Sequence, residues 1–188
     1  MSTIITKDGN RKLAFDKARF ERFIIQATSS FSHINPTEYI EKNIKSIINK
    51  EEVKAEQLTN GLILSALDYI GVEDTSEHPD WTKVAAHIYL RSRYKKASIN
   101  RSFDPSEKYG DFYGLIKQLA GKGLYDGKLL RDYSKEEIKE LGKLIDPKKD
   151  ELFTYIGIKS LSDRYLTNDH EGNVYELPQE RYLIIAMA

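Results

Sequence analysis

Four successive stretches in the first half of the chain place apolar side chains at the three- and four-residue spacing of an amphipathic helix. Asp16 precedes the first stretch and Asn35-Pro36 opens the second, and these residue types favour the start of a helix. A helix with one apolar face must bury that face against another element. The sequence therefore predicts a four-helix bundle, with helices near residues 17–31, 36–48, 54–70 and 79–96.

A short β-hairpin is predicted ahead of the bundle, with strands over residues 3–6 and 11–15. The turn between them is Asp8-Gly9-Asn10, and glycine and asparagine tolerate the positive φ angles that tight turns need. Because the second strand leads directly into the first helix, we expect the hairpin to cover one end of the bundle.

The pattern changes after residues 98–111, a polar stretch that is expected to be a linker. Aromatic residues become more frequent, and the predicted helices are shorter, over residues 109–119, 134–144 and 152–166 and from Pro178 onward. A capping-box signature opens the second of these at Ser134, and a small hairpin is expected to turn at residues 171–173. The predicted fold is mainly α, with a first domain over residues 1–98 and a helical region over residues 99–188.

The composition excludes several classes of protein. There is no cysteine, so disulfides, thiolate zinc sites and thiol chemistry are excluded within this chain. The 29 basic and 29 acidic residues give a formal net charge of zero, which argues against a nucleic-acid coat or a polybasic membrane anchor. No apolar run is long enough to span a bilayer, and the first residues lack the apolar core of a signal peptide. A soluble cytoplasmic protein is therefore expected.

No catalytic or metal site is predicted within the chain. The phosphate-binding motifs GxxxxGKS/T and GxGxxG are absent, and no acidic or tyrosine side chains form a convincing acid–base pair. The four histidines are scattered and offer no tight pair of metal ligands.

The apolar stripe of the fourth helix continues at the same spacing beyond Ile88 into two cations, Arg91 and Lys95. The simpler interpretation is that these side chains extend to water and stabilise the end of the helix. Three further cations flank the predicted hairpin: Lys7, Arg11 and Lys17. Because the bundle can bring all five cations to one mouth, the pattern indicates a polyanion such as a triphosphate. Backbone groups near Ile5 could then bond to a base edge, and Leu58 could pack on its ring.

Both halves of the chain resemble known families. The first half resembles the ATP-cone, a nucleotide-binding regulatory domain, in the stretches ITKDGNRKLAFDKARF and HPDWTKVAAHIYLRSRYKKA. The second half resembles the helical N-terminal region of the large subunit of class I ribonucleotide reductase, in the stretches LYDGKLLRDYSKEEIKELGKLID, DELFTYIGIKSLSDRYL and GNVYELPQERYLIIAMA. The two patterns in this order are highly specific.

The resemblance implies an allosteric switch of overall activity, in which ATP supports activity and dATP stops it by changing the oligomeric state. ATP or dATP, with Mg²⁺, would be the effector. The resemblance also implies which residues bind the nucleotide. The Ile5 backbone would contact the base, and Leu58 and Thr59 would line the base and ribose. The phosphates would be bound by Lys7, Lys17 and Lys95, with Arg91 on the same helix face as Lys95. The arginine that usually follows the first lysine is missing here, and Arg11 or Lys12 could replace it.

The parent enzyme would reduce ribonucleotides to deoxyribonucleotides, in deoxyribonucleotide biosynthesis and DNA replication. Its partners would be a radical-generating small subunit and further large subunits, with no nucleic acid and no membrane. The chain ends in the apolar segment YLIIAMA, so we expect an N-terminal fragment that lacks the catalytic cysteines and is inactive alone. The alternative is a degenerate ATP-cone that serves only as a subunit-interaction module. A transcriptional regulator with an ATP-cone and a zinc ribbon is disfavoured because cysteine is absent.

Overall fold

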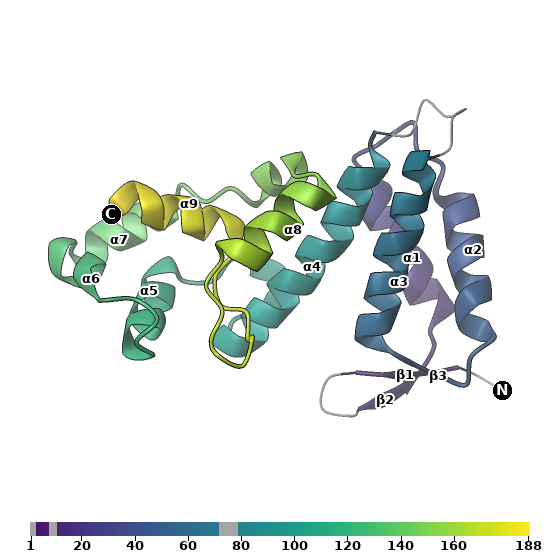
Figure 1. Ribbon diagram of the computed structural model, residues 1–188, viewed down its shortest axis with the longest axis horizontal. Coiled ribbons are helices and arrows are strands. Elements are labelled where there is room, and N and C mark those ends of the chain that lie inside the picture. The colour runs from purple at the N-terminus through teal and green to yellow at the C-terminus, as the bar shows by residue number, and fades with distance from the viewer. Residues whose placement is uncertain (1–2, 8–10, 72–78) are drawn as a thin grey trace. The chain divides into compact units, whose positions relative to one another are not determined.

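The computed structural model describes residues 3–7, 11–71 and 79–188 (Figure 1). Its internal contacts divide the chain into two compact units, Met1–Tyr89 and Leu90–Ala188. The predicted domain boundary between residues 98 and 99 stays a prediction.

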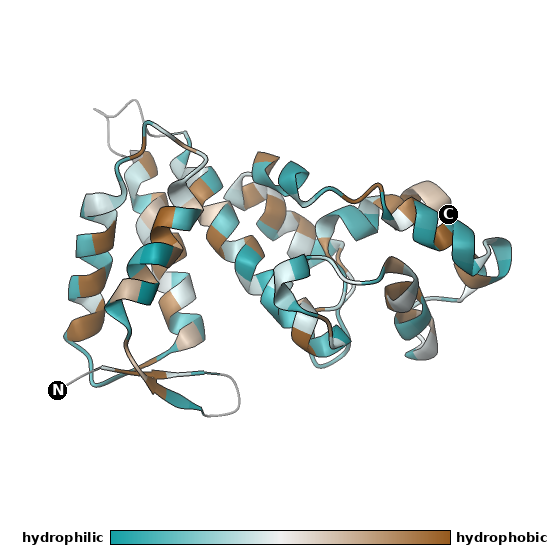
Figure 2. Cartoon of the chain, turned by 180° about the vertical axis from the view of Figure 1, so that it is seen from behind, coloured by the Kyte–Doolittle hydropathy of each residue, from teal (hydrophilic) through white to brown (hydrophobic). Residues whose placement is uncertain are grey.

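Four helices build the first unit, as the sequence predicts. They are α1 (Lys17–Thr28), α2 (Pro36–Ile48), α3 (Ala55–Leu67) with a short 3-10 turn after it (Asp68–Gly71), and the first part of α4 (Trp81–Arg101). Both predicted caps are present, because the Asp16 carboxylate accepts a hydrogen bond from the Arg19 backbone N–H at 2.9 Å and the Asn35 side chain accepts one from the Thr37 N–H at 3.0 Å. Figure 2 shows that these helices carry both apolar and hydrophilic residues, as amphipathic spacing requires.

A three-stranded sheet lies across one end of helices α1, α2 and α3 (Figure 1). Its strands are β1 (Ile4–Thr6), β2 (Lys12–Ala14) and β3 (Glu52–Lys54), in the order β2-β1-β3. The predicted pairing of β1 with β2 is confirmed as antiparallel, whereas the predicted turn at residues 8–10 lies outside the described residues. The third strand was not predicted, and it pairs with β1 in parallel.

An aromatic cluster fills the end of the first unit where α4 begins. Trp81 is 2% exposed, and its ring stacks on that of Tyr69 with centroids 4.5 Å apart. The Tyr39 ring lies 5.0 Å from the Trp81 ring, and the Tyr39 hydroxyl donates to the Leu62 carbonyl at 2.6 Å. Burial is the largest reason that the pKa of Tyr39 is raised, so this hydroxyl stays protonated and remains a donor.

The second unit is also mainly helical. It contains the rest of α4, then a 3-10 turn (Pro105–Glu107), α5 (Phe112–Gly121), α6 (Lys128–Asp132), α7 (Lys135–Gly142), a 3-10 segment (Pro147–Leu152), α8 (Tyr155–Arg164) and α9 (Pro178–Met187). The predicted capping box at Ser134 and Glu137 is confirmed, and the predicted start of a helix at Pro178 is correct. The predicted hairpin at residues 171–173 is a single antiparallel bridge between Asn168 and Val174.

Several helix boundaries differ from the prediction, and two of them bear on the expected linker. The fourth helix continues to Arg101 instead of ending near Lys96, so the expected linker begins inside it. The next helix begins at Phe112 because the Asp111 side chain caps it, accepting from the Gly114 backbone N–H at 3.0 Å. The mainly α fold with a small sheet is confirmed. None of the helices in the described part of the chain combines the length and the apolar character that crossing a membrane requires.

Ion pairs and hydrogen bonds lie inside the second unit beside its apolar core. Arg101 Nη1 lies 2.8 Å from Glu180 Oε1, and the two side chains are only 4% and 0% exposed. Glu180 also accepts from the Leu177 backbone N–H at 2.9 Å, at the start of α9. A second buried acid, Glu176, accepts from the Tyr125 hydroxyl at 2.5 Å. Burial raises the pKa of Glu180 to about 7 against the opposing effect of Arg101.

The raised pKa of Glu180 predicts a pH-dependent stability for the second unit. Between pH 4.5 and 7 the folded state holds this proton and the unfolded state does not, so this group's contribution to stability falls as pH rises through about 7. We expect the wild type to lose on the order of 1–3 kcal/mol relative to Glu180→Gln between pH 5 and pH 8. Urea unfolding of both proteins at several pH values measures this difference. If the free energies of unfolding of the two proteins changed with pH by the same amount, the prediction would be contradicted.

Candidate functional site

The sheet has one face toward the helices and one face toward solvent. Successive residues of a strand point to opposite faces, so Ile5 and Val53, which are in register, share a face. Both are buried, at 8% and 6% exposed. Lys12 and Glu52 lie on the other face and are exposed. The face of Ile5 is therefore the one that contacts the helices.

Two of the predicted cations come together at the end of the hairpin. The Lys7 backbone N–H donates to the Arg11 carbonyl at 2.9 Å, so these two residues lie opposite each other just beyond β1 and β2. By the same alternation, both lie on the face of Ile5 and Leu13. Lys7 is half-buried and Arg11 is exposed. The register thus places two basic residues opposite each other, and strand alternation puts both on the helix-facing side of the sheet, where their positive charges would favour an anionic ligand.

The backbone of Ile5 is already engaged in the sheet. Thr3 pairs with Phe15 through a hydrogen bond of 2.8 Å, and Lys7 pairs with Arg11 in the same way. Hydrogen-bonded pairs alternate along an antiparallel ladder, so Ile5 and Leu13 between them also form such a pair. A base that used the Ile5 backbone would therefore have to share the carbonyl oxygen, which has a second lone pair. The role of Ile5 as a base contact stays a prediction.

Helix α3 carries the residues that are predicted to contact the base and ribose. It begins directly after β3, which places Leu58 and Thr59 in its first turns, and both residues are half-buried. The Thr59 hydroxyl donates to the Ala55 carbonyl at 3.0 Å. Because the hydroxyl proton already donates to a backbone carbonyl, the Thr59 oxygen can act only as an acceptor toward a ligand, for example from a ribose hydroxyl.

The remaining predicted ligands lie on two helices. Lys17 is the first residue of α1, and its Nζ lies 3.7 Å from Glu21 Oε1, one turn further along. Arg91 and Lys95 lie in the part of α4 that belongs to the second unit, and both are exposed. The assignment of these three residues as phosphate ligands stays a prediction. Within the described ranges, no group of three or more His, Asp and Glu side chains is arranged to hold a metal ion.

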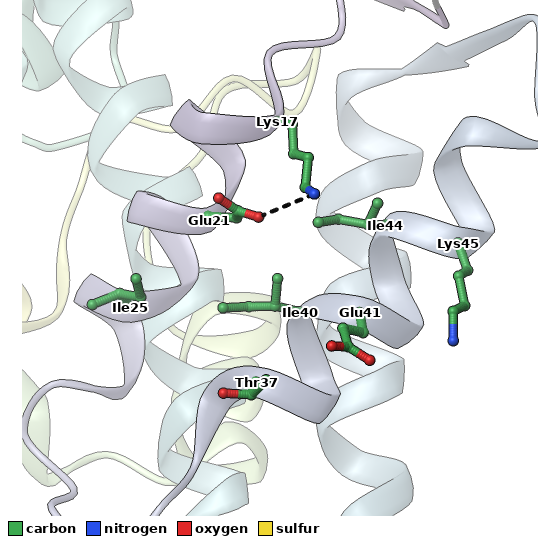
Figure 3. Close-up of a pocket in the computed structure, with 8 residues that line it drawn as sticks. All are labelled: Lys17, Glu21, Ile25, Thr37, Ile40, Glu41, Ile44 and Lys45. Carbon is green, nitrogen blue, oxygen red and sulfur yellow. Dashed lines mark ion pairs between the residues drawn. The ribbon is translucent and has the colours of Figure 1, made fainter.

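A cleft of about 380 Å³ lies between α1 and α2 in the first unit (Figure 3). It is lined by Lys17, Glu21, Ile25, Thr37, Ile40, Glu41, Ile44 and Lys45. Figure 3 shows three isoleucines from the two helices along it and the ion pair of Lys17 with Glu21 near one end. Because its two lysines are balanced by two glutamates, the cleft does not concentrate the positive charge that a triphosphate requires. Sequence reasoning missed this cleft, since Ile40 and Ile44 fit the buried stripe of their helix and Ile25 lies outside the stripe predicted for the other helix.

Comparison with known proteins shows which class of protein the chain is similar to. The family model described as "Ribonucleotide reductase, all-alpha domain" matches residues 151–188. The ribonucleoside-diphosphate reductase subunit alpha of Helicobacter pylori is 27% identical over 188 residues, which is 100% of this chain and 22% of the relative. The corresponding subunit of enterobacteria phage T4 is 30% identical over 185 residues, which is 98% of this chain and 23% of that protein.

A third relative, ribonucleoside-diphosphate reductase 1 subunit alpha of Escherichia coli, is 30% identical over 135 residues, or 71% of this chain and 16% of the relative. The chain is therefore related to the large subunits of ribonucleotide reductases. More particularly, it resembles the amino-terminal part of ribonucleoside-diphosphate reductase subunit alpha, and it spans about 22% of the length of such relatives. The predicted resemblance is confirmed.

Proposed function

We propose that the first unit is the allosteric overall-activity domain of a ribonucleoside-diphosphate reductase large subunit. On this proposal it binds ATP, which activates, or dATP, which inhibits, with Mg²⁺ as counterion. The observation that supports it best is the pair Lys7 and Arg11, which the hairpin register places together on the helix-facing side of the sheet. The relatedness of the chain to reductase alpha subunits adds to this support.

The parent protein is then a cytoplasmic reductase that converts ribonucleotides to deoxyribonucleotides for DNA replication. It would work with a radical-generating small subunit and form oligomers of large subunits. An effector changes an oligomer equilibrium only through its different affinity for the two states. ATP and dATP differ by the 2′-hydroxyl, and one hydrogen bond contributes on the order of 1 kcal/mol net, which corresponds to a several-fold difference in affinity. The acceptor lone pairs of Thr59 suit such a bond.

Calorimetric titration of the chain with ATP and with dATP, followed by sizing of each complex, tests the proposal. We expect both nucleotides to bind and one of them, dATP, to promote association. If neither nucleotide binds at millimolar concentration, the regulatory proposal is wrong.

A second candidate function is a subunit-interaction module without a working nucleotide site. The cleft between α1 and α2 favours it, because Ile25 on its wall is 51% exposed and Lys17 is already paired with Glu21. The two candidate functions predict different effects of ATP on the unfolding temperature, since a ligand that binds only the folded state must raise it. An unchanged unfolding temperature in millimolar ATP would favour the interaction module.

The proposed phosphate role of Lys95 gives a direct prediction. Replacing Lys95 by alanine is expected to weaken ATP and dATP alike, by about ten-fold or more, because a charge-assisted hydrogen bond to the phosphates contributes about 1.5–3 kcal/mol. Titration calorimetry of Lys95→Ala measures the effect, with Lys96→Ala as a matched control one position further round the helix. Equal affinities for the two variants would show that Lys95 is not a phosphate ligand.

A further inference from the structure

The outer face of the sheet carries a polar cluster for which the nucleotide proposal has no role. Glu52 Oε2 accepts from Lys12 Nζ at 2.9 Å, and the other carboxylate oxygen accepts from the Thr6 hydroxyl. Glu52 is on β3, Thr6 is on β1 and Lys12 is on β2, so one carboxylate spans all three strands. The hydrogen bond from Thr6, followed by that from Lys12, holds the pKa of Glu52 below its usual range, so the carboxylate is charged at neutral pH.

This cluster joins two strands that do not pair with each other. In the order β2-β1-β3, the edge strand β2 has only three residues and bonds to β1 alone. The side chain of Glu52 reaches across β1 and holds Lys12 on the solvent-facing side. A strand that turned or slipped by one residue would exchange its two faces. Lys12 and Arg11 are adjacent, so holding Lys12 on the outer face keeps Arg11 on the helix-facing side.

We propose that Glu52 is a positioning residue for the nucleotide site. It anchors Lys12 on the outer face and thereby keeps Arg11 beside Lys7, where the two cations meet the phosphates of a nucleoside triphosphate. This inference rests on the proposed function. It also assigns different roles to the two residues that could replace the missing arginine of the ATP-cone pattern: Arg11 faces the ligand and Lys12 holds the strand.

A role of Lys12 as a phosphate ligand predicts the opposite change in ATP affinity. If Lys12 were itself a phosphate ligand, Glu52 would compete with the phosphates for it, and removing the Glu52 charge would tighten ATP binding. If Glu52 positions the strand, removing its charge weakens ATP binding. The sign of the change therefore decides between the two roles.

The experiment is a calorimetric titration of ATP into the wild type, Glu52→Gln and the control Glu51→Gln. The control removes the same charge from the neighbouring exposed residue and so accounts for the general electrostatic effect on an anion. We expect Glu52→Gln to bind ATP about 2–5-fold more weakly than Glu51→Gln, the scale of one exposed ion pair. Lys12→Gln should weaken binding by the same factor, and the double variant should be no weaker than either single variant.

A charge exchange separates positioning from a general loss of structure. Combining Lys12→Glu with Glu52→Lys restores the ion pair across β1 and should recover the wild-type affinity for ATP. The unfolding temperature of Glu52→Gln should match that of Glu51→Gln, because the anchoring ion pair is exposed. Tighter binding by Glu52→Gln, equal binding by the two glutamine variants, or failure of the exchange to recover affinity would each overturn the inference. Absence of ATP binding by the wild type would instead overturn the proposed function itself.

Discussion

Replacing Trp81 by alanine is expected to lower the free energy of unfolding of the first unit by about 3–5 kcal/mol. The indole is 2% exposed and packs on the rings of Tyr69 and Tyr39, with centroids 4.5 and 5.0 Å away. Its removal loses both the transfer energy of a large apolar side chain and its contacts with two aromatic neighbours, and leaves a cavity that a packed interior fills only partly.

Urea unfolding measures this loss, and two further variants calibrate it. Trp81→Phe retains part of the packing and should lose less, while Ile25→Ala, at a position 51% exposed, should change stability by well under 1 kcal/mol. If the first unit also binds ATP, saturating ATP should restore part of the stability of Trp81→Ala. A loss for Trp81→Ala no larger than that for Ile25→Ala would contradict the packing argument.

Replacing Arg101 by methionine should destabilise the second unit by about 3–5 kcal/mol at pH 8, because it leaves the carboxylate of Glu180 buried and without its cation. Arg101 also donates to the Tyr175 carbonyl at 3.3 Å, so one more buried acceptor loses a partner. The pKa of Glu180, already raised by burial, should rise further, and the loss should therefore be smaller at pH 5, where the carboxyl is neutral.

The double variant Arg101→Met with Glu180→Leu distinguishes the value of the ion pair from the cost of breaking it. Removing both charges from a buried site is often neutral or stabilising, so the double variant should recover most of the stability that Arg101→Met loses. Urea unfolding of the single and double variants at pH 5 and pH 8 gives the coupling energy. A double variant that is less stable than Arg101→Met would contradict this account.

The features that the sequence predicts correctly depend on neighbouring residues. Asp16, Asn35 and Ser134 each bond to a backbone N–H two or three residues away, so their effect is visible in a short window. The pairing of β1 with β2 is predictable for the same reason, because one turn separates the strands. From that register alone, Lys7 and Arg11 can be placed opposite each other.

The features that were missed depend on residues far apart in the chain. Glu52-Val53-Lys54 is too short to show a strand pattern, and it becomes a strand because β1 lies beside it. From the sequence alone Glu180 would be taken for a surface residue, because its buried partner Arg101 lies far away in the chain. The pairing of Glu52 with Lys12 is likewise invisible in the sequence. No local window contains both members of these pairs, so sequence periodicity alone cannot find them.

The parallel pairing of β1 with β3 also determines when the candidate site can form during folding. Ile5 lies beside Val53, so the central strand, already paired locally with β2, must wait for a second partner that follows both α1 and α2 in the chain. Closing such a long loop costs conformational entropy before the contact returns any stability. The helices can form from local contacts, whereas the complete sheet, with Glu52 across it, is a late event. The backbone amide of Ile4, which donates to the Glu51 carbonyl beside β3, should therefore gain protection from hydrogen exchange after those of α1 and α2. This amide thus reports the last step in assembling the first unit.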